Sequence, residues 1–447
     1  MNRWYRRIRF KSVPRVFWAV LTMLLFLLLT VVFAGYKKNQ EIVLEFGMFT
    51  GSNWDVANAN SFVIIDQAID RFEQEHPGVR IHYYSGVIKD DYSEWLSRKL
   101  LAGEEPDVFM VLSNDFNQFS SLGVMKNLDD LIRKDPDFDQ EQYFSSAFRT
   151  GQYGGAQYAL PYEVMPTLMF VNKTLLTREG IEMPDQDWTW EDLYEICQKV
   201  TKDTDGDGAL DYFGIYNFDW MDAVCSNGGE IFKSDGSACY FTDDRIVESV
   251  KYIRQLNELN QGQKVVQEDF NGGRVAFMPL TFAEYRTYKT YPYKIRRYAN
   301  FQWDCITMPA GNQGENLSQV DTLLMGISAN TRKEKLAWEF LKLLTYDEKF
   351  QTDIFRYSQG ASVLKAVTQS REMENILQED MEKGDTVISG NLLGRVIEEG
   401  HIEPQFKRYE QALSLADSEI NNILENEKSI DSSLKILQRT VNSYLQQ

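Results

Sequence analysis

Histidine is scarce in this 447-residue sequence, which contains only His76, His82 and His401, scattered instead of clustered in a motif. Multi-histidine metal sites and Ser-His-Asp triads both depend on histidine, so neither is expected here. The four cysteines have no C-x-x-C spacing, and the motifs G-x-S-x-G, H-E-x-x-H, G-x-G-x-x-G and the P-loop are absent. The sequence therefore indicates no familiar catalytic or redox chemistry.

Positive charge is also scarce beyond the first forty residues. Residues 1–40 hold eight Lys and Arg and no acid, which leaves 39 bases against 66 acids for the rest of the chain. A body this acidic repels phosphate backbones, and no basic stripe interleaved with aromatics follows, so we expect no nucleic-acid binding. The 43% of apolar residues is enough to build the cores of two or three domains.

One long apolar run, residues 16–34, is interrupted only by two threonines. As a helix it would span nearly the ~30 Å hydrocarbon core of a bilayer. Six bases precede it, which predicts a cytoplasmic N-terminus and places residues 36–447 outside the cell membrane. No cysteine follows the run for lipid attachment. Its length favours an uncleaved signal anchor, and the small pair Ala34-Gly35 leaves cleavage and secretion as the alternative.

The body of the chain begins with alternating strand and helix patterns. Strands are predicted at 41–49, 79–84 and 106–112, with amphipathic helices at 62–72 and 92–101 between them. This alternation indicates an α/β fold. Because ligands collect beyond the carboxyl ends of strands in such sheets, residues 52–55 and 113–115 are expected to face a common crevice.

A second α/β series follows a strand at 167–171. Thr189 with Asp192, and Thr331 with Glu334, have the spacing of capping boxes that begin helices. The tail from about residue 404 predicts two helices, broken near 426–429. Cys225 and Cys239 lie in a glycine-rich stretch, where a disulfide would form in an oxidising compartment.

An acidic loop at 203–211 has the spacing of a cation site. Positions 1, 3, 5 and 9 are carboxylates, position 6 is a glycine, and position 7 would contribute a backbone carbonyl. These predicted ligands are Asp203, Asp205, Asp207, Asp211 and the carbonyl of Ala209. Position 12 is Gly214 instead of glutamate, so the loop is not an EF-hand. We expect a structural Ca²⁺; the alternative is an acidic turn held by Asx hydrogen bonds.

Several segments together resemble the extracellular solute-binding proteins of ABC importers, in the branch that includes maltose-binding protein and binds sugars and oligosaccharides. The similar segments run through most of residues 41–447, and each is weak alone. They are FEQEHPGV at 72–79, LAGEEPDVF at 101–109, LGVMKNLDDL at 122–131, YALPY at 158–162, FVNK at 170–173, WTWEDL at 188–193, ISANT at 327–331 and AWEFLK at 337–342.

The resemblance implies a two-lobed periplasmic-binding-protein-like fold of type II, with a hinge between the lobes. One lobe would comprise 41–161 with 320–358, and the other 162–319 with 359–447, after the N-terminal segment 1–40. The chain would cross between them at 160–166, 309–321 and 355–362. The lobes of such proteins close on their ligand.

The resemblance also implies a sugar site in the cleft between the lobes. Sugar rings need flat apolar faces, and their hydroxyls need polar partners, because a hydroxyl desolvated without one is costly. Asn114 and Asp115 match a ligand-binding position of the family, and Glu163 lies two residues from a family contact position. The full set of candidates is Trp54, Asp55, Asn114, Asp115, Glu163, Trp220, Phe282 or Tyr285, and Asp321.

The function that the resemblance implies is capture of a sugar or oligosaccharide outside the cell and its delivery to the transmembrane subunits of an ABC permease, without catalysis. Three alternatives remain at this point. They are a surface glycosidase that uses a carboxylate pair, a membrane-tethered sugar-sensing module, and a structural calcium-binding surface protein.

Overall fold

The computed structural model describes Met23 and residues 41–54, 61–84, 86–290, 301–379 and 387–446. Within these ranges, no helix has the length and apolar content to cross a membrane. The predicted membrane segment at 16–34 lies outside the described residues apart from Met23, and so does Asp55.

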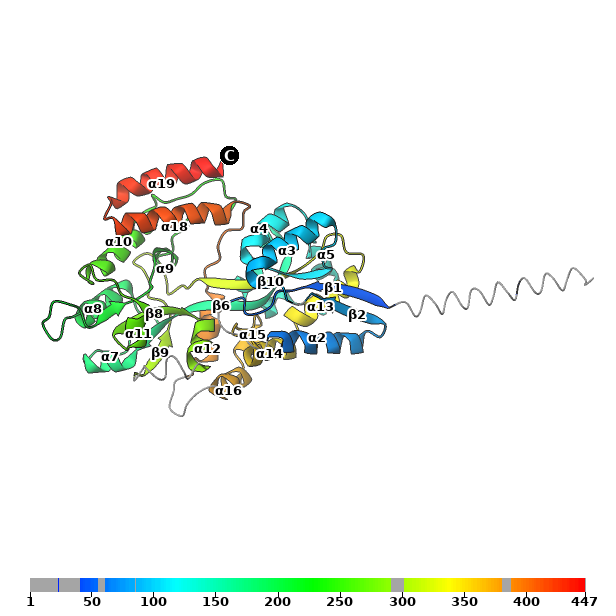
Figure 1. Cartoon of the computed structure of the whole chain (residues 1–447), viewed down its shortest axis with the longest axis horizontal. Coiled ribbons are helices and arrows are strands. Elements are labelled where there is room, and N and C mark those ends of the chain that lie inside the picture. Colours follow the sequence, from blue (N-terminus) through cyan, green and yellow to red (C-terminus); the bar gives the residue numbers. More distant parts are fainter. Residues whose placement is uncertain are drawn as a thin grey trace, which may run out of the picture.

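The molecule consists of two α/β lobes side by side, joined near the middle of the chain's longest strand (Figure 1). The strands follow the order β2-β1-β3-β10-β6-β8-β7, and β9 also pairs with β6. The first lobe contains the strands β1 (Ile42–Gly47), β2 (Val79–Tyr83), β3 (Val108–Val111) and β10 (Val320–Ile327). The second contains β7 (Phe213–Ile215), β8 (Val275–Thr281) and β9 (Trp303–Ile306).

β6 (Ala159–Asn172) belongs to both lobes. Residues 159–166 pair antiparallel with β10, and residues 167–172 pair with β8 and β9. Nearly all of its side chains are buried, because both sheets are covered by helices. This strand makes the crossing predicted at 160–166, and the return between β9 and β10 makes the one predicted at 309–321.

Helices cover both faces of each half of the sheet. Those of the first lobe are α2 (Ser61–Glu75), α3 (Lys89–Ala102), α4 (Ser113–Ser121), α5 (Asp129–Lys134), α6 (Ser145–Thr150), α13 (Glu334–Thr345) and α14 (Glu348–Tyr357). Those of the second are α7 (Lys173–Arg178), α8 (Trp190–Val200), α9 (Trp220–Ser226), α10 (Asp244–Glu258), α11 (Gln267–Asn271), α12 (Phe282–Thr290), α18 (Tyr409–Glu425) and α19 (Ile430–Leu445). Two very short strands, β4 (Gln152–Tyr153) and β5 (Ala156–Gln157), form a hairpin before β6.

The predicted order of elements in the first lobe is confirmed, and so is the helical pair at the end of the chain. The capping box of α8 is present, since Thr189 and Asp192 each accept a hydrogen bond from the other's backbone N–H. The one predicted at Thr331 is wrong. Lys333 is the residue before α13, and the Thr331 hydroxyl instead donates to Asp107 at 2.6 Å.

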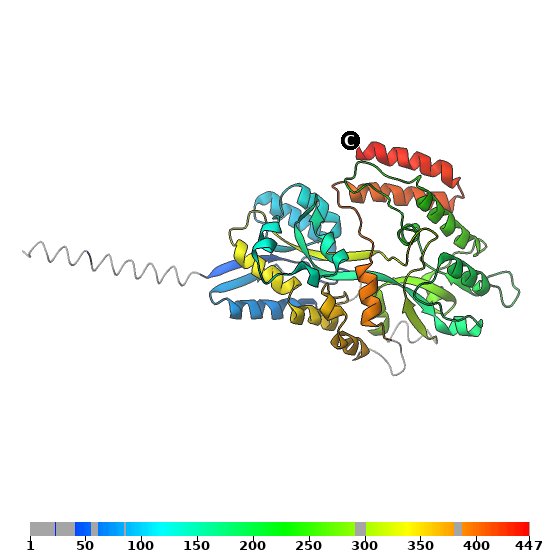
Figure 2. The same ribbon diagram turned by 180° about the vertical axis from the view of Figure 1, so that it is seen from behind.

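The third predicted crossing, at 355–362, is not where the chain changes lobe. The following helices α15 (Lys365–Thr368), α16 (Arg371–Glu379) and α17 (Gly390–Glu398) pack on helices of the first lobe: α15 and α16 contact α14, and α17 contacts α6. α17, orange in Figure 2, lies where the lobes meet. The chain enters the second lobe only at 399–408, where His401 pairs with Gln319. The boundary expected at residue 359 is therefore corrected.

All four cysteines are buried and lie within the described residues, and Cys197, Cys225 and Cys239 are free thiols. Burial raises the pKa of the Cys239 thiol to about 11, so it stays protonated near neutral pH. The disulfide expected between Cys225 and Cys239 is not formed in this structure.

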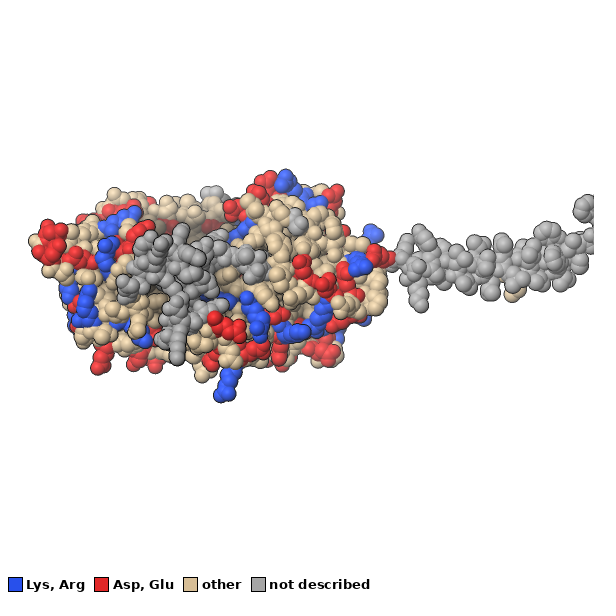
Figure 3. All heavy atoms as spheres, turned by 60° about the horizontal axis from the view of Figure 1, so that its bottom comes forward, with Lys and Arg blue, Asp and Glu red and all other residues tan. Residues whose placement is uncertain are grey.

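Charged side chains of both signs are interspersed on the face shown in Figure 3. This distribution fits a solvated surface and contrasts with the concentrated acids described next.

Candidate ligand-binding cleft between the lobes

Asp321 lies at the start of β10, directly after the chain has returned from the second lobe. Its side chain is open to solvent, yet burial raises its pKa, and the charge of Glu403 raises it further. The charge of Lys89, at the start of α3, partly opposes the shift. Asp321 thus lies within electrostatic reach of Glu403 and Lys89, and its role in ligand binding stays a prediction.

Glu403 and Glu410 bring two further carboxylates to this place from the second lobe. Glu403 is half-buried in the crossing segment 399–408, and Glu410 occupies the first turn of α18. Burial raises the pKa of Glu410, and the charges of Asp321, Glu403 and Asp115 add to the increase. The negative charges of these three carboxylates therefore act on Glu410.

Asp115 faces them from the first lobe. It is half-buried in the first turn of α4, directly after β3, where the helix dipole favours negative charge. Burial raises its pKa, while the Ser93 hydroxyl, which donates to its carboxylate at 2.5 Å, works in the opposite direction. Its neighbour Asn114 is exposed. The charge of Asp115 acts on Glu410 of the second lobe, and the role of Asn114 and Asp115 in ligand binding stays a prediction.

Trp54 and Glu163 are joined to each other. The indole N–H of Trp54 donates to Glu163 at 2.7 Å, and the Ser358 hydroxyl donates to the other carboxylate oxygen. Glu163 is only 4% exposed, and burial raises its pKa, against the lowering effect of these two bonds and of the charge of Arg286. Glu163 therefore supports Trp54 instead of offering its carboxylate to a ligand. The half-buried Trp54 keeps part of its ring available.

Three predicted aromatic platforms are not in the cleft. Trp220 is 1% exposed and donates its indole N–H to Asp417 at 2.9 Å. Phe282 and Tyr285 are stacked on each other in the core, with a centroid distance of 5.7 Å. A stacking platform needs an open ring face, so these three predictions are wrong for this structure.

The carboxylates of Glu403 and Glu410 were missed in the sequence because neither lies in a motif or at a strand end. Only the three-dimensional structure reveals them, because the crossing segment 399–408 and the start of α18 lie near the beginning of β10. Position along the chain gave no reason to pair residue 410 with residue 115.

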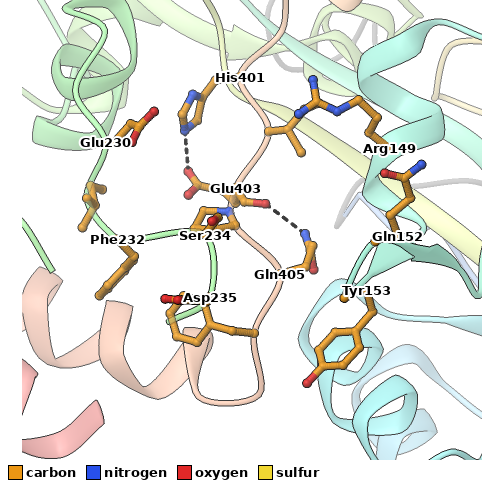
Figure 4. Close-up of a pocket in the computed structure, with 16 residues that line it drawn as sticks. Arg149, Gln152, Tyr153, Glu230, Phe232, Ser234, Asp235, His401, Glu403 and Gln405 are labelled. Carbon is orange, nitrogen blue, oxygen red and sulfur yellow. Dashed lines mark hydrogen bonds and ion pairs between the residues drawn. The ribbon is translucent and has the colours of Figure 1, made fainter. Parts of the chain in front are cut away.

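A cavity of about 690 Å³ adjoins Glu403 at the seam of the lobes. Arg149, Gln152 and Tyr153 come from the first lobe, and Glu230 lies opposite them in Figure 4. The segment that carries Glu403 runs between these two walls (Figure 4), with the His401 Nε2 atom 3.6 Å from a carboxylate oxygen of Glu403. The cavity thus has polar walls from both lobes.

The acidic loop at 203–211 lies away from this cleft, in the connection between α8 and β7. Carboxylate oxygens of Asp203, Asp205 and Asp211 lie within 4.8 Å of one another. Asp207 is not in this group, and its carboxylate accepts from the Ala209 N–H at 2.8 Å. Hydrogen bonds from the N–H groups of Gly208 and Gly206 lower the pKa of Asp203. The loop therefore holds three ionised oxygen ligands together, as a hard cation requires.

The two lobes share one strand, and polar side chains from both line the cavity between them. The family model described as bacterial extracellular solute-binding protein matches residues 57–349. The chain belongs to this family. The family description specifies binding, so the glycosidase alternative is set aside.

Individual relatives are distant. The chain is 29% identical to the arabinooligosaccharide-binding protein of Bacillus subtilis over 249 residues, which is 52% of this chain and 53% of that one. The fold is similar to the cyclic alpha-maltosyl-1,6-maltose binding protein from Arthrobacter globiformis, with a TM-score of 0.73, 18% identity and coverage of 90% of this chain and 99% of that one. It is also similar to the sugar-binding protein MalE from Xanthomonas citri, with a TM-score of 0.73, 14% identity and coverage of 90% and 97%.

Proposed function

We propose that this chain captures a sugar or oligosaccharide in the interlobe cleft and delivers it to the transmembrane subunits of an ABC permease. The observation that carries the proposal is the strand β6, which pairs with β10 in one lobe and with β8 and β9 in the other and so joins two lobes that flank a cleft. A ligand that contacts both walls stabilises the closed arrangement more than the open one. The arabinooligosaccharide and maltosyl-maltose specificities in the names of the similar proteins support a saccharide ligand.

Within the cleft, we propose that Trp54 supplies the apolar ring face and that Asn114, Asp115 and Asp321 bind hydroxyl groups. The side chain of Trp54 is fixed by its bond to Glu163, so stacking on it costs little conformational entropy. Asn114 is exposed and Asp321 is open to solvent, as groups that await a ligand must be.

A titration of the full-length protein with a saccharide panel, followed by small-angle scattering and by melting temperature, tests the proposal. A ligand should reduce the radius of gyration and raise the melting temperature with concentration. Trp54→Ala should weaken the binding, whereas Leu101→Ala, which removes a 90% exposed side chain, serves as the matched control. A panel that changes neither the scattering nor the melting temperature would contradict the proposal.

We also propose that residues 16–34 anchor the chain at the outer face of the cell membrane. The support is the length of the apolar run and the bases that precede it. Fractionation of cells tests this proposal: the protein should stay with membranes after a high-salt wash and be extracted by detergent. Release into the medium with a new N-terminus near residue 35 would show cleavage instead.

Finally, we propose that the acidic loop binds a structural Ca²⁺ through Asp203, Asp205 and Asp211. The support is the convergence of three carboxylate oxygens within 4.8 Å. Melting with Ca²⁺ and with a chelator tests it. Calcium should raise the melting temperature of the natural chain and not that of Asp203→Asn, while Asp185→Asn, in a similar acidic turn, keeps the response. Equal melting with and without Ca²⁺ would refute the site.

A further inference from the structure

Arg286 joins the two lobes on one side of the molecule. It lies in α12, which follows β8 in the second lobe, and it is 8% exposed. Its guanidinium donates to three backbone carbonyls at the end of α14, in the first lobe. They are the carbonyl of Ile354, at 3.4 Å, and those of Phe355 and Ser358. A buried arginine of the second lobe is thus bound to the first.

The position of these carbonyls explains why an arginine binds them. Phe355 and Ser358 are among the last four carbonyls of α14, which have no partner inside the helix, and the helix dipole makes this end partly negative. Arg286 stays charged and offers five N–H donors in a planar fork. Without it, buried carbonyls would need water as their donor, and the joint between α12 and α14 would open to solvent.

Other contacts at the same place show that the joint is tightly packed. The Phe282 ring of α12 lies edge-on to the Phe355 ring, with a centroid distance of 6.2 Å. The Tyr285 hydroxyl accepts from the backbone N–H of Ile388, just before α17 of the first lobe, at 3.2 Å. In Figure 1, α12 and α14 lie on the lower side of the sheet, and α4 and α18 on the upper side. None of the described residues of α12 or α14 lines the cavity at the seam of the lobes, so the seam is packed on one side and hollow elsewhere.

The same joint is connected to Trp54. Ser358 accepts from Arg286 through its carbonyl and donates to Glu163 through its hydroxyl. Glu163 in turn accepts from the indole N–H of Trp54 at 2.7 Å. The segment after α14 is packed closely on β6, since a Cβ on Gly360 would lie 2.6 Å from a carboxylate oxygen of Glu163. A continuous series of contacts therefore runs from the second lobe to the aromatic ring proposed to hold the ligand.

We propose that Arg286 is a positioning residue of the hinge: it holds the pivot about which the lobes move and, through Ser358 and Glu163, keeps Trp54 in place for the ligand. This inference rests on the proposed binding function. Closure by hinge motion requires that one side of the two lobes stays joined while the other side opens and closes. The Arg286 joint meets this requirement, because separating it would leave buried carbonyls without donors. Ligand affinity therefore depends on a buried residue that lies behind the ligand site.

The relative mobility of the lobes can be measured without a ligand. Spin labels on Leu122→Cys, at the end of α4 in the first lobe, and on Ile436→Cys, in α19 of the second, report the distribution of interlobe distances. Both positions are exposed, and the natural cysteines are buried, which keeps them from reacting with the label. The measurement uses the full-length protein in detergent micelles.

Arg254 provides a matched control within one lobe. It lies in α10 and donates to carbonyls at the end of α18, those of Ile423 at 3.1 Å and Lys428 at 2.7 Å. Arg254→Met and Arg286→Met should both lower the melting temperature, because each leaves carbonyls without a donor. Only Arg286→Met should at least double the width of the distance distribution and weaken saccharide binding about tenfold or more. Arg254→Met should leave the width and the affinity close to those of the natural chain.

Equal widths for Arg286→Met and Arg254→Met would overturn the proposal, and so would an unchanged affinity in Arg286→Met. Arg286→Lys keeps the charge but not the fork of donors, so its width should lie between those of the natural chain and of Arg286→Met. If the methionine variant does not fold, a lysine variant with the width of the natural chain overturns the proposal. A natural chain that binds no saccharide contradicts the proposed function, whereas the widths, measured without a ligand, decide separately on the pivot.

Discussion

Glu163 provides a sharp test of the physical reasoning about the cleft, because one buried carboxylate holds both Trp54 and Ser358. In Glu163→Ala, the indole N–H and the buried Ser358 hydroxyl lose their acceptor. Each lost bond costs about 1–3 kcal/mol, and removal of a poorly solvated charge returns part of this. We expect a net loss of about 2–3 kcal/mol, which lowers the melting temperature of the whole two-lobed body by roughly 3 °C.

Glu163→Gln is the informative companion variant. Its amide oxygen still accepts from the indole of Trp54, and its NH₂ group donates to the Ser358 hydroxyl. We therefore expect a loss of about 1 kcal/mol or less near neutral pH. Ligand affinity should fall in the alanine variant, in which Trp54 is released, and remain close to normal in the glutamine variant.

The contribution of Glu163 to folding stability changes with pH in a defined direction. Burial raises the pKa of folded Glu163, so the folded state holds the proton more tightly than the unfolded state does. The stability from this group is fully present below the unfolded value of about 4.3 and is lost as the pH rises through the raised folded value. The advantage of the natural chain over Glu163→Gln should therefore be largest in acid. Thermal unfolding followed by tryptophan fluorescence measures it. Equal melting of both variants, or an advantage that grows with pH, would refute the reasoning.

Three other substitutions have definite expected outcomes. Gly214→Ala should destabilise by about 2 kcal/mol, because its Cβ would lie 2.3 Å from that of Cys197, and denaturant unfolding measures this loss. Trp220→Phe should lower the free energy of unfolding by about 1 kcal/mol, because the hydrogen bond to Asp417 is lost. Ligand affinity measured by calorimetry should stay within twofold of that of the natural chain. A large loss of affinity would show that Trp220 does belong to the ligand site. Asp135→Asn should destabilise by about 1 kcal/mol at pH 7. Burial by itself would raise the pKa of Asp135, but the ammonium of Lys342 and the indole of Trp338, both on α13, lower it. The stability from Asp135 is fully present above the unfolded pKa of about 3.9 and is lost as the pH falls from there through the lowered folded pKa, so the difference from the natural chain should shrink in that acid range of a melting series.

Local patterns predicted local structure well. The apolar periodicity of 62–72 specifies α2, and the continuous apolar run before residue 112 specifies a buried strand. Both depend only on neighbouring residues. The amphipathic helices α15 to α17 were placed in the wrong lobe because periodicity shows that a helix has a buried face, and not which surface covers it.

The site was predictable only where it depends on a strand end. Asp115 follows β3 and Asp321 begins β10, so in both cases a strand end is the reason for the prediction. Trp220 also follows a strand, but an aromatic in that position packs inward as readily as outward. Glu410 depends on the path of a crossing segment that is distant in sequence, and single-sequence reasoning has no means to place it.

The sharing of β6 has a consequence for how the molecule comes apart. Half of this strand supplies the central hydrogen-bonding partner for β10, and the other half does the same for β8 and β9. If one lobe melts, the other loses the continuation of its own innermost strand and exposes unpaired amides. The two halves therefore depend on each other for integrity even though they move as separate bodies, and we expect a single cooperative unfolding event instead of two.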